Sequence, residues 1–381
     1  MREISCSVMR GGTSRGLFFK DSDLPKDPEL RDRVCCSAFG GPDPYGTQIN
    51  GLGGPIGNMN KLAIISKREG ETNSVNYEFG QIAVKSWVIG KRANCGNISS
   101  AVGPYAIEAG FIDVIEEPFT TVRIYNTNTK KFIVEKVPVK NGKVVYDGDF
   151  SIAGCPGTGS KLQLDFIEPG GATTGRLLPT GKVKETIHTR DFGDFEVSII
   201  DAANPFVFVR AEDLGFTGTE TGTEITNSGN PVEKLMQIRE TACVMLGWAK
   251  DIDDARRNSP GMPKACFVAP PTPFKTPLGE ELRAEDYDIA VRMIEFGTGL
   301  DIMALTGCVC VGVASKIKGS VVWETLSEKA HNRNELVLAH PSGLVPVGMD
   351  VTFDNGEYRA NSGTIYRTAR KLMSGTIYVN E

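Results

Sequence analysis

Residues 94–110, NCGNISSAVGPYAIEAG, contain the pattern that decides the fold. Over residues 98–109 apolar side chains recur at helical spacing, and Gly110 supplies a C-terminal stop. A second segment, residues 303–317 (MALTGCVCVGVASKI), is apolar on nearly every side. Because a helix without a polar face is buried all round, we expect each segment to form the central helix of its own half of the molecule.

Short strand-like runs separated by Gly, Asn and Pro fill most of the remaining chain, which holds 43 glycines. This composition suits a strand-rich protein better than a helical bundle. The runs expected to form strands are 62–65, 121–125, 132–138, 143–146, 196–200, 206–209, 287–296, 363–366 and 375–379. We therefore expect an α+β fold with two similar halves, each a curved, mostly antiparallel sheet around one helix. The expected halves are 1–182 plus about 367–381, and 183–366.

The bulk composition limits the classes of partner. Of the 381 residues, 40% are apolar and 23% charged, as in soluble globular proteins. A net charge of -5 gives no general attraction to nucleic acid, so an anionic substrate needs a local positive site. No signal peptide and no run of membrane-spanning length is visible. The nine scattered cysteines favour reduced thiols in the cytoplasm, and none of the three histidines has zinc-site spacing, so no metal is expected.

The first candidate for chemistry is Cys95, at the entrance to the first expected central helix. A helix N-terminus presents N–H groups without intrahelical acceptors and a positive dipole end, which stabilise a thiolate and bind carboxylates. Gly96 permits close approach of a ligand to the backbone, and the N–H groups of Gly96 and Asn97 are the expected donors. The alternative is a buried, inert cysteine before a capped helix.

The second candidate is Lys61, which follows a glycine-rich stretch and precedes an apolar strand. Residues 53–61 read GGPIGNMNK, and a loop of this kind can bind an anion or deliver a proton donor. The spacing is not that of a P-loop, since Asn60 precedes the lysine and Leu62 follows it. Solvated lysines at strand starts are common, and that remains the alternative for Lys61.

Two further turns offer donors for a carboxylate. Residues 9–16, MRGGTSRG, place Thr13, Ser14 and Arg15 between glycines. Near the C-terminus, Ser342 and Gly343 of the HPSG turn offer a hydroxyl and a backbone N–H. Simple turns with solvated side chains are the alternative in both places. No G-x-S-x-G elbow occurs, which argues against a hydrolase.

Taken together, these segments resemble the methylaconitate isomerase (PrpF-like) family. The resemblance runs in order from residue 9 to residue 375, through MRGGTSRGLFF, GGPDPYGTQINGLGG, NMNKLAII, NCGNISSAVGPYAIEAG, DAANPFVFV, HPSG and RTARKLMSG. It implies a diaminopimelate-epimerase-like fold with the active site in the cleft between two pseudo-symmetric halves. It also implies isomerisation of small unsaturated di- or tricarboxylates without a cofactor.

Carried over by position, Cys95 and Lys61 match the family's acid/base pair. The other residues expected to bind substrate are Thr13, Ser14, Arg15, Asn60, Gly96, Asn97, Ser342 and Gly343. The segments around Cys95 and Lys61 look most similar to methylitaconate delta-isomerases, so the expected reaction is a 1,3-proton shift from methylitaconate to 2,3-dimethylmaleate. Two places depart from the family pattern: Asn60 replaces an expected serine, and Gly299-Leu300-Asp301 lacks an expected histidine.

Several alternatives stay open at this point. Within the family, trans-methylaconitate isomerisation and 4-oxalomesaconate tautomerisation use related substrates. A two-cysteine epimerase would need a second thiol before the second central helix, but Cys308 and Cys310 fall within that helix. A non-catalytic dicarboxylate-binding protein would use the same anion sites. Which of Cys95 and Lys61 is base and which is acid is open, and Lys61 could instead be a charge that stabilises the Cys95 thiolate. We expect a homo-oligomer that binds neither nucleic acid nor membranes.

Overall fold

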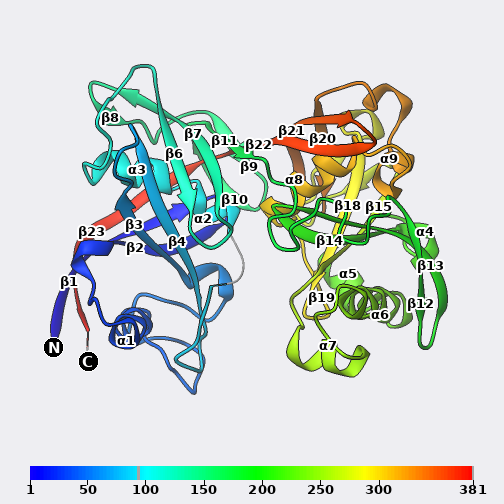
Figure 1. The fold of residues 1–381 in the computed structure, drawn as a ribbon, viewed down its shortest axis with the longest axis horizontal. Coiled ribbons are helices and arrows are strands. Elements are labelled where there is room, and N and C mark those ends of the chain that lie inside the picture. The colour runs from blue at the N-terminus through cyan, green and yellow to red at the C-terminus, as the bar shows by residue number, and fades with distance from the viewer. Residues whose placement is uncertain (92–94, 380–381) are drawn as a thin grey trace. The chain divides into compact units, whose positions relative to one another are not determined.

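The computed structural model describes residues 1–91 and 95–379, so Asn94 of the first motif lies outside the described residues (Figure 1). The chain forms two compact units, Met1–Asp165 with Tyr366–Glu381, and Phe166–Ile365. The chain therefore passes from the first unit to the second between Asp165 and Phe166, earlier than the boundary expected near residue 182. The reason is local: Asp201 Oδ2 accepts the N–H groups of Thr173 and Thr174 at 2.9 and 2.6 Å, which fastens this segment to a strand of the second unit.

The first unit is built on one twisted sheet with the strand order β23–β1–β2–β3–β4–β6–β7. Neighbours in this order are antiparallel except β2–β3 and β4–β6, which are parallel. The strands of this unit are β1 (Arg2–Gly11), β2 (Ser14–Lys20), β3 (Lys61–Lys67), β4 (Ser74–Ile82), β5 (Ile89–Gly90), β6 (Phe119–Asn126), β7 (Lys131–Lys140), β8 (Lys143–Val144), β9 (Phe150–Ile152), β10 (Cys155–Gly159) and β23 (Ala369–Val379), of which β9 and β10 form a separate hairpin. Two more strands, β11 (Leu162–Ile167) and β22 (Glu357–Arg367), run across the divisions between the units.

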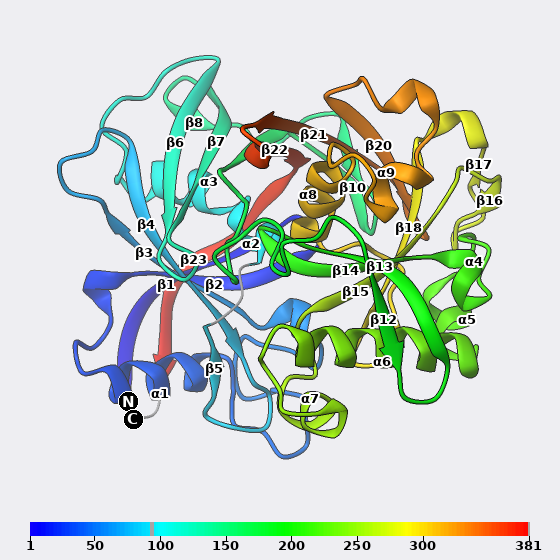
Figure 2. The same cartoon turned by 45° about the vertical axis from the view of Figure 1, so that its right-hand side comes forward.

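Helices cover both faces of this sheet. Helix α1 (Pro28–Ala38) buries its apolar side against one face, where Leu17, Phe19 and Ile64 point (Figures 1 and 2). Helices α2 (Gly96–Ser99) and α3 (Val102–Glu108) pack on the other face, where the Phe18 and Tyr105 rings lie 5.3 Å apart. Short 3₁₀ turns, η1 (Asp21–Asp23) and η2 (Gly57–Met59), precede α1 and β3.

The single helix expected over 98–109 is therefore wrong in detail, because it is broken into α2 and α3. Pro104 explains the break: it has no N–H to donate to the Ser100 carbonyl, and its ring clashes with that carbonyl in a regular helix. The four residues of α2 carry much less dipole than the long helix assumed for the Cys95 site. Any anion binding there must rely on individual backbone N–H groups.

A buried carboxyl group ties α3 to the sheet. Glu135, on β7, is fully buried, and its Oε2 accepts the N–H of Gly103 at 2.8 Å. A Cβ on Gly103 would lie 2.5 Å from that oxygen, so glycine is required for the contact. The helix has no capping side chain of its own, and Glu135 supplies the missing acceptor. Burial raises the pKa of Glu135 well above its ordinary value, and the Gly103 N–H opposes this only in part.

Glu135 should therefore make stability depend on pH. The folded chain holds this proton to higher pH than the unfolded chain, which releases it near the ordinary pKa, so the stabilising contribution is lost as pH rises above about 4.5. Relative to Glu135→Gln, the wild type should lose up to about 1.4 kcal/mol of unfolding free energy per pH unit. Urea unfolding at pH 5.5, 6.5 and 7.5 measures this. Glu69→Gln, at an exposed position, is the control, and a pH-independent difference for Glu135→Gln would contradict the assignment.

The second unit repeats the topology of the first. Its strands follow the order β12–β13–β14–β15–β18–β20–β21–β22, and again two neighbouring pairs, β14–β15 and β18–β20, are parallel. Its strands are β12 (Glu185–Thr189), β13 (Gly193–Ala202), β14 (Asn204–Arg210), β15 (Lys264–Ala269), β16 (Phe274–Lys275), β17 (Glu281–Leu282), β18 (Ile289–Glu295), β19 (Thr298–Gly299), β20 (Glu335–His340) and β21 (Gly343–Asp354). Every run expected to form a strand overlaps one of the observed strands.

Helices of the second unit also lie on two faces (Figures 1 and 2). They are α4 (Ala211–Leu214), α5 (Gly222–Thr226), α6 (Asn230–Met245), α7 (Ile252–Asn258), α8 (Leu305–Ala314) and α9 (Val321–Thr325), with 3₁₀ turns η3 (Ala284–Asp286) and η4 (Glu328–Ala330). Helix α8, whose residues are all buried, is the core of the expected 303–317 segment. Within residues 1–91 and 95–379, no helix is both long and apolar enough to cross a membrane.

The repeat pairs specific elements. The hairpin β1–β2 corresponds to β13–β14, the parallel strand β3 to β15, and the antiparallel strand β4 to β18. Helix α1 corresponds in chain order to α6 and α7, and the α2–α3 pair corresponds to α8. Gly16 lies opposite Lys61 where β2 meets β3, and Phe206 lies opposite Lys264 where β14 meets β15. The two lysines therefore hold equivalent positions.

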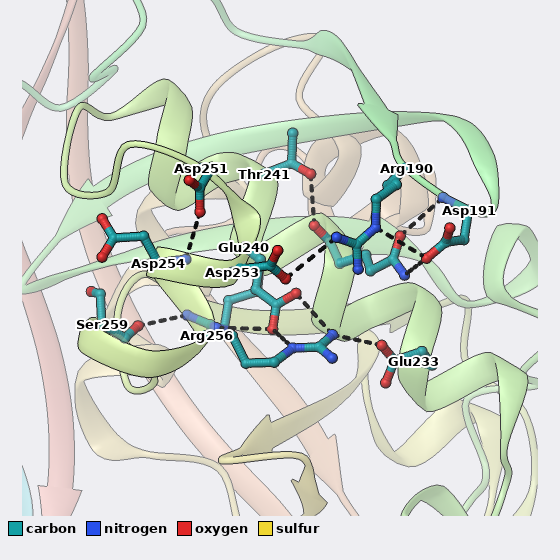
Figure 3. A network of polar contacts seen from close by, with 12 residues as sticks. Arg190, Asp191, Glu233, Glu240, Thr241, Asp251, Asp253, Asp254, Arg256 and Ser259 are labelled. Atoms are coloured by element: carbon teal, nitrogen blue, oxygen red, sulfur yellow. Dashed lines mark hydrogen bonds and ion pairs between the residues drawn. The ribbon is translucent and has the colours of Figure 1, made fainter.

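A buried ion pair fastens α7 to α6 (Figure 3). The side chain of Glu240, on α6, is fully buried, and its two oxygens accept from Arg256 of α7 at 2.8 and 3.0 Å. Arg256 also contacts Glu233 at 2.6 Å. A bidentate contact of this kind compensates the cost of burying the carboxylate. This network joins α6 to α7, and its residues belong to these two helices, not to α8.

Candidate active site

Cys95 lies at the start of α2, with its side chain facing the hairpin β1–β2. Its Sγ is 3.8 Å from the hydroxyl oxygen of Ser14, the first residue of β2. Of the nine cysteines, all with free thiols, seven are buried and only Cys95 and Cys155 are half-exposed. Cys95 therefore combines access with a polar neighbour, which an inert core cysteine would lack.

Strand register places Lys61 on the same face of the sheet as Ser14. Lys61 lies directly opposite Gly16, and residues two apart on a strand point to the same face, so Ser14 is its diagonal neighbour. This spacing is about 8 Å between Cα atoms, which long side chains can span. A Cβ on Gly16 would lie 2.1 Å from the Lys61 carbonyl oxygen, so glycine permits this close approach. The sheet thus brings the Lys61 and Cys95 segments to one face of the first unit.

The turn between β1 and β2 is connected to the start of α2. The Asn97 side chain donates from Nδ2 to the Thr13 hydroxyl at 3.0 Å, and its Oδ1 accepts from Arg367 Nε at 3.1 Å. Gly12 has φ +53°, and a Cβ there would lie 2.3 Å from Asn97 Oδ1. The Thr13 hydroxyl keeps its own proton to donate, and the backbone N–H groups of Gly96 and Asn97 belong to the first turn of α2.

Two residues expected to bind substrate instead hold the glycine-rich loop. Asn60 is fully buried, and its Nδ2 donates to the Gly54 carbonyl at 2.6 Å, while its Oδ1 accepts the Gly54 N–H at 3.1 Å. Arg15 Nη2 donates to the carbonyls of Leu52 and Gly53 at 3.3 and 2.9 Å. Both side chains therefore shape the loop that precedes Lys61. Contact of either side chain with a substrate stays a prediction.

Three neighbours of the candidate residues had no recognisable signal in the sequence. Arg367, on β22, is buried and orients Asn97. Gln81, on β4, accepts a hydrogen bond from Lys61 Nζ through its Oε1. Tyr77, also on β4, is fully buried; burial raises its pKa well above the ordinary value, the nearby Cys95 adds to this increase, and a hydrogen bond with Ser99 opposes it. Only the pairing of β3 with β4 brings the last two to the site.

Ser342 and Gly343 belong to the second unit. The Ser342 N–H donates to the Asp301 carbonyl at 2.9 Å and contacts His340 Nδ1 at 3.2 Å, and Gly343 has φ +137°. Asp301 in turn accepts the Gly222 N–H at 2.7 Å through its carboxylate. These contacts define a tight turn. Its participation in the site that holds Cys95 stays a prediction.

Comparison with solved structures identifies the fold that this topology and the two central helical segments form. A hydroxyproline epimerase from Agrobacterium vitis, solved with bound trans-4-hydroxy-L-proline, aligns with 100% of this chain and 94% of its own, at a TM-score of 0.55 and 13% identity. A probable proline racemase gives a TM-score of 0.54. The fold is therefore the α+β, diaminopimelate-epimerase-like fold expected from the sequence.

Closer relatives define the family. The family model described as PrpF protein matches residues 1–380. The 3-methylitaconate isomerase of Eubacterium barkeri is 38% identical, covering 99% of this chain and 97% of the relative. The 2-methyl-aconitate isomerase of Shewanella oneidensis is 34% identical, with coverage of 99% and 97%. The 4-oxalomesaconate tautomerase of Pseudomonas putida is 32% identical, with coverage of 99% and 96%. A solved methylitaconate-delta-isomerase superposes at a TM-score of 0.86, with 38% identity and coverage of 99% and 96%. The chain belongs to the PrpF family.

Proposed function

We propose that this chain is a cofactor-independent isomerase that catalyses a 1,3-proton shift in a small unsaturated dicarboxylate, converting 3-methylitaconate to 2,3-dimethylmaleate. The observation that carries the proposal is that Ser14, whose hydroxyl lies 3.8 Å from Cys95 Sγ, is the diagonal neighbour of Lys61 on one face of the sheet. The 38% identity to a 3-methylitaconate isomerase supports this choice of substrate.

The reaction is a removal and a return of one proton. One member of the Cys95–Lys61 pair removes the proton from C3, the carbon that lies between a carboxylate and the methylene-bearing carbon. The electron pair delocalises over the double bond and the neighbouring carboxylate as a dienolate. The other member protonates the methylene carbon, which becomes a methyl group. The double bond, which joined C2 to the methylene carbon, now joins C2 to C3. Positioned acid and base groups contribute about 10²–10⁴-fold to such a rate.

Stabilising the dienolate must supply much of the remaining rate enhancement, because such carbon acids are very weak. The first N–H groups of α2, those of Gly96 and Asn97, and the side-chain donors of Thr13, Ser14 and Arg15 can take this role. A preorganised donor of this kind is worth about 3–4 kcal/mol in an oxyanion hole. The Arg367–Asn97–Thr13 chain of hydrogen bonds holds the hydroxyl in place.

The same site suits two related reactions, which are the second candidates. Relatives that cover nearly the whole chain are named 2-methyl-aconitate isomerase and 4-oxalomesaconate tautomerase. Both names denote proton shifts in unsaturated polycarboxylates. We further propose that the enzyme works in the cytoplasm as a homo-oligomer, with Ser342 and Gly343 completing the substrate site. The nine free thiols support the compartment.

Proton NMR in D₂O tests the proposed function directly. The purified wild type is incubated separately with 3-methylitaconate, 2-methylaconitate and 4-oxalomesaconate. We expect 3-methylitaconate to lose its C3 proton signal and to give dimethylmaleate with one deuterium in the new methyl group. Faster conversion of another acid would reassign the substrate. Binding of these acids by calorimetry without any exchange would show a dicarboxylate-binding protein instead of an enzyme.

A further inference from the structure

Among residues 1–91 and 95–379, the contacts of Lys61 are made to neutral groups. Its Nζ donates to Gln81 Oε1, and the same ammonium lies 5.8 Å from the centroid of the Phe79 ring. Lys61 and Gln81 are direct partners in the antiparallel pair β3–β4. A carbonyl oxygen and the face of an aromatic ring both favour the charged form of a lysine, but neither cancels its charge.

The amide of Gln81 is fixed in one orientation. Its Nε2 donates to the carbonyls of Gly57 and Asn60 at 3.2 and 3.1 Å. Turning the amide over would place Oε1 against these two acceptors and the NH₂ group against the ammonium of Lys61. Because carbonyls only accept and an ammonium only donates, that arrangement is excluded. The glycine-rich loop therefore decides which atom Gln81 presents to Lys61.

The second unit contains the same pair with a different partner. Lys264 opens β15 as Lys61 opens β3, and its Nζ pairs with the Glu295 carboxylate of β18. Ala265 pairs with Ile294, so the next residues along the two strands, Lys264 and Glu295, lie opposite each other. Glu295 therefore holds the position that Gln81 holds opposite Lys61 in the first unit. The repeat thus places a carboxylate in the second unit where the first unit has an amide. The charge of Lys264 is compensated by the Glu295 carboxylate, whereas the amide of Gln81 leaves the charge of Lys61 uncompensated.

We propose that Gln81 is the positioning residue of Lys61. It holds the lysine through a neutral acceptor, so that the ammonium's charge is left for the substrate carboxylate and its proton remains transferable. A glutamate at this position would pair with Lys61 and compensate its charge, as Glu295 does for Lys264. The inference rests on the proposed function, because it assigns Lys61 a role in the same reaction.

Three variants test this inference by kinetics. Gln81→Glu should raise KM for the dicarboxylate, lower kcat/KM about 10- to 100-fold, and move the basic limb of the kcat/KM profile up by about one pH unit. Gln81→Met removes the acceptor and should lower kcat while moving the basic limb to lower pH. Glu295→Gln is the matched control, which makes the reverse exchange at the equivalent position, and its pH profile should equal that of the wild type.

A second readout does not depend on turnover. Competitive acetylation with acetic anhydride, followed by mass spectrometry, gives the pH dependence of Lys61 reactivity in each protein. We expect the profile of Lys61 to move to higher pH in Gln81→Glu and to lower pH in Gln81→Met. Unchanged Lys61 profiles in both variants would overturn the inference. If the wild type converts none of the three acids, the proposed function fails, while the acetylation profiles still decide the role of Gln81.

Discussion

Replacing Cys95 by serine is expected to reduce isomerisation of 3-methylitaconate by about 10²–10⁴-fold, the contribution of one positioned acid/base group. A serine hydroxyl is close in size to the thiol and keeps a polar contact with Ser14, so the fold should be unchanged. It is, however, a far poorer base near neutral pH, because a thiol ionises much more readily than an alcohol. The rate at which the C3 proton is lost and deuterium enters the new methyl group in D₂O, and kcat/KM measured in parallel, give the effect.

The chain offers a matched control for this experiment. Cys155 is the other half-exposed free cysteine of the first unit, and Cys155→Ser should retain wild-type rates. Comparable thermal midpoints for the two variants would exclude misfolding as the cause of a loss. Undiminished exchange in Cys95→Ser would remove this residue from the proposed acid/base pair, and the chemistry would have to be assigned elsewhere.

The second large effect is expected at Lys61. Lys61→Ala should also lower kcat/KM by about 10²–10⁴-fold, because it removes both a proton carrier and the positive charge that faces the substrate. Lys61→Arg separates these two roles, since a guanidinium keeps the charge but does not release its proton in a protein. If Lys61 transfers a proton, the arginine variant should be as slow as the alanine variant.

Recovery of activity in Lys61→Arg would instead show that Lys61 acts as a fixed charge that stabilises the Cys95 thiolate or the dienolate. Lys67→Ala is the matched control, because Lys67 ends the same strand and makes a surface ion pair with Asp113 at 2.5 Å. Exposed pairs of this kind contribute little to stability. The rates of Lys67→Ala should therefore equal those of the wild type.

The sequence alone was enough to predict the fold class and the segments that carry Cys95 and Lys61. Helical spacing, glycine-rich approaches and a resemblance along the whole chain all pointed to the same architecture. The break that Pro104 causes between α2 and α3 was missed because the apolar pattern of 98–109 continues through it, although a proline inside a helix removes the hydrogen bond to the carbonyl four residues earlier. The helical spacing of the apolar residues predicted the helical segment correctly, but it does not show where a proline interrupts the helix.

The contacts of individual polar side chains were harder to foresee. Asn60 and Arg15 stand beside the expected site, but hydrogen bonds with the loop, formed only on folding, decide where their amide and guanidinium groups point. Gln81 is separated from Lys61 by a hairpin, and the register of β3 with β4 brings the two together. Such register is set by packing across the whole sheet, which no short pattern encodes.

The pairing of β1 with β23 has a consequence for biosynthesis. Strand β1 begins at Arg2 and is flanked by β2 on one side and by β23, from Ala369 to Val379, on the other. The ribosome makes these two partners almost a full chain length apart, at about 5–20 residues per second. Arg367, which orients Asn97 beside the candidate acid/base residue Cys95, is likewise made after the second unit. The first unit therefore completes its sheet and its site only after the second unit has been translated, and nascent chains released early carry Cys95 without the scaffold that would make it useful.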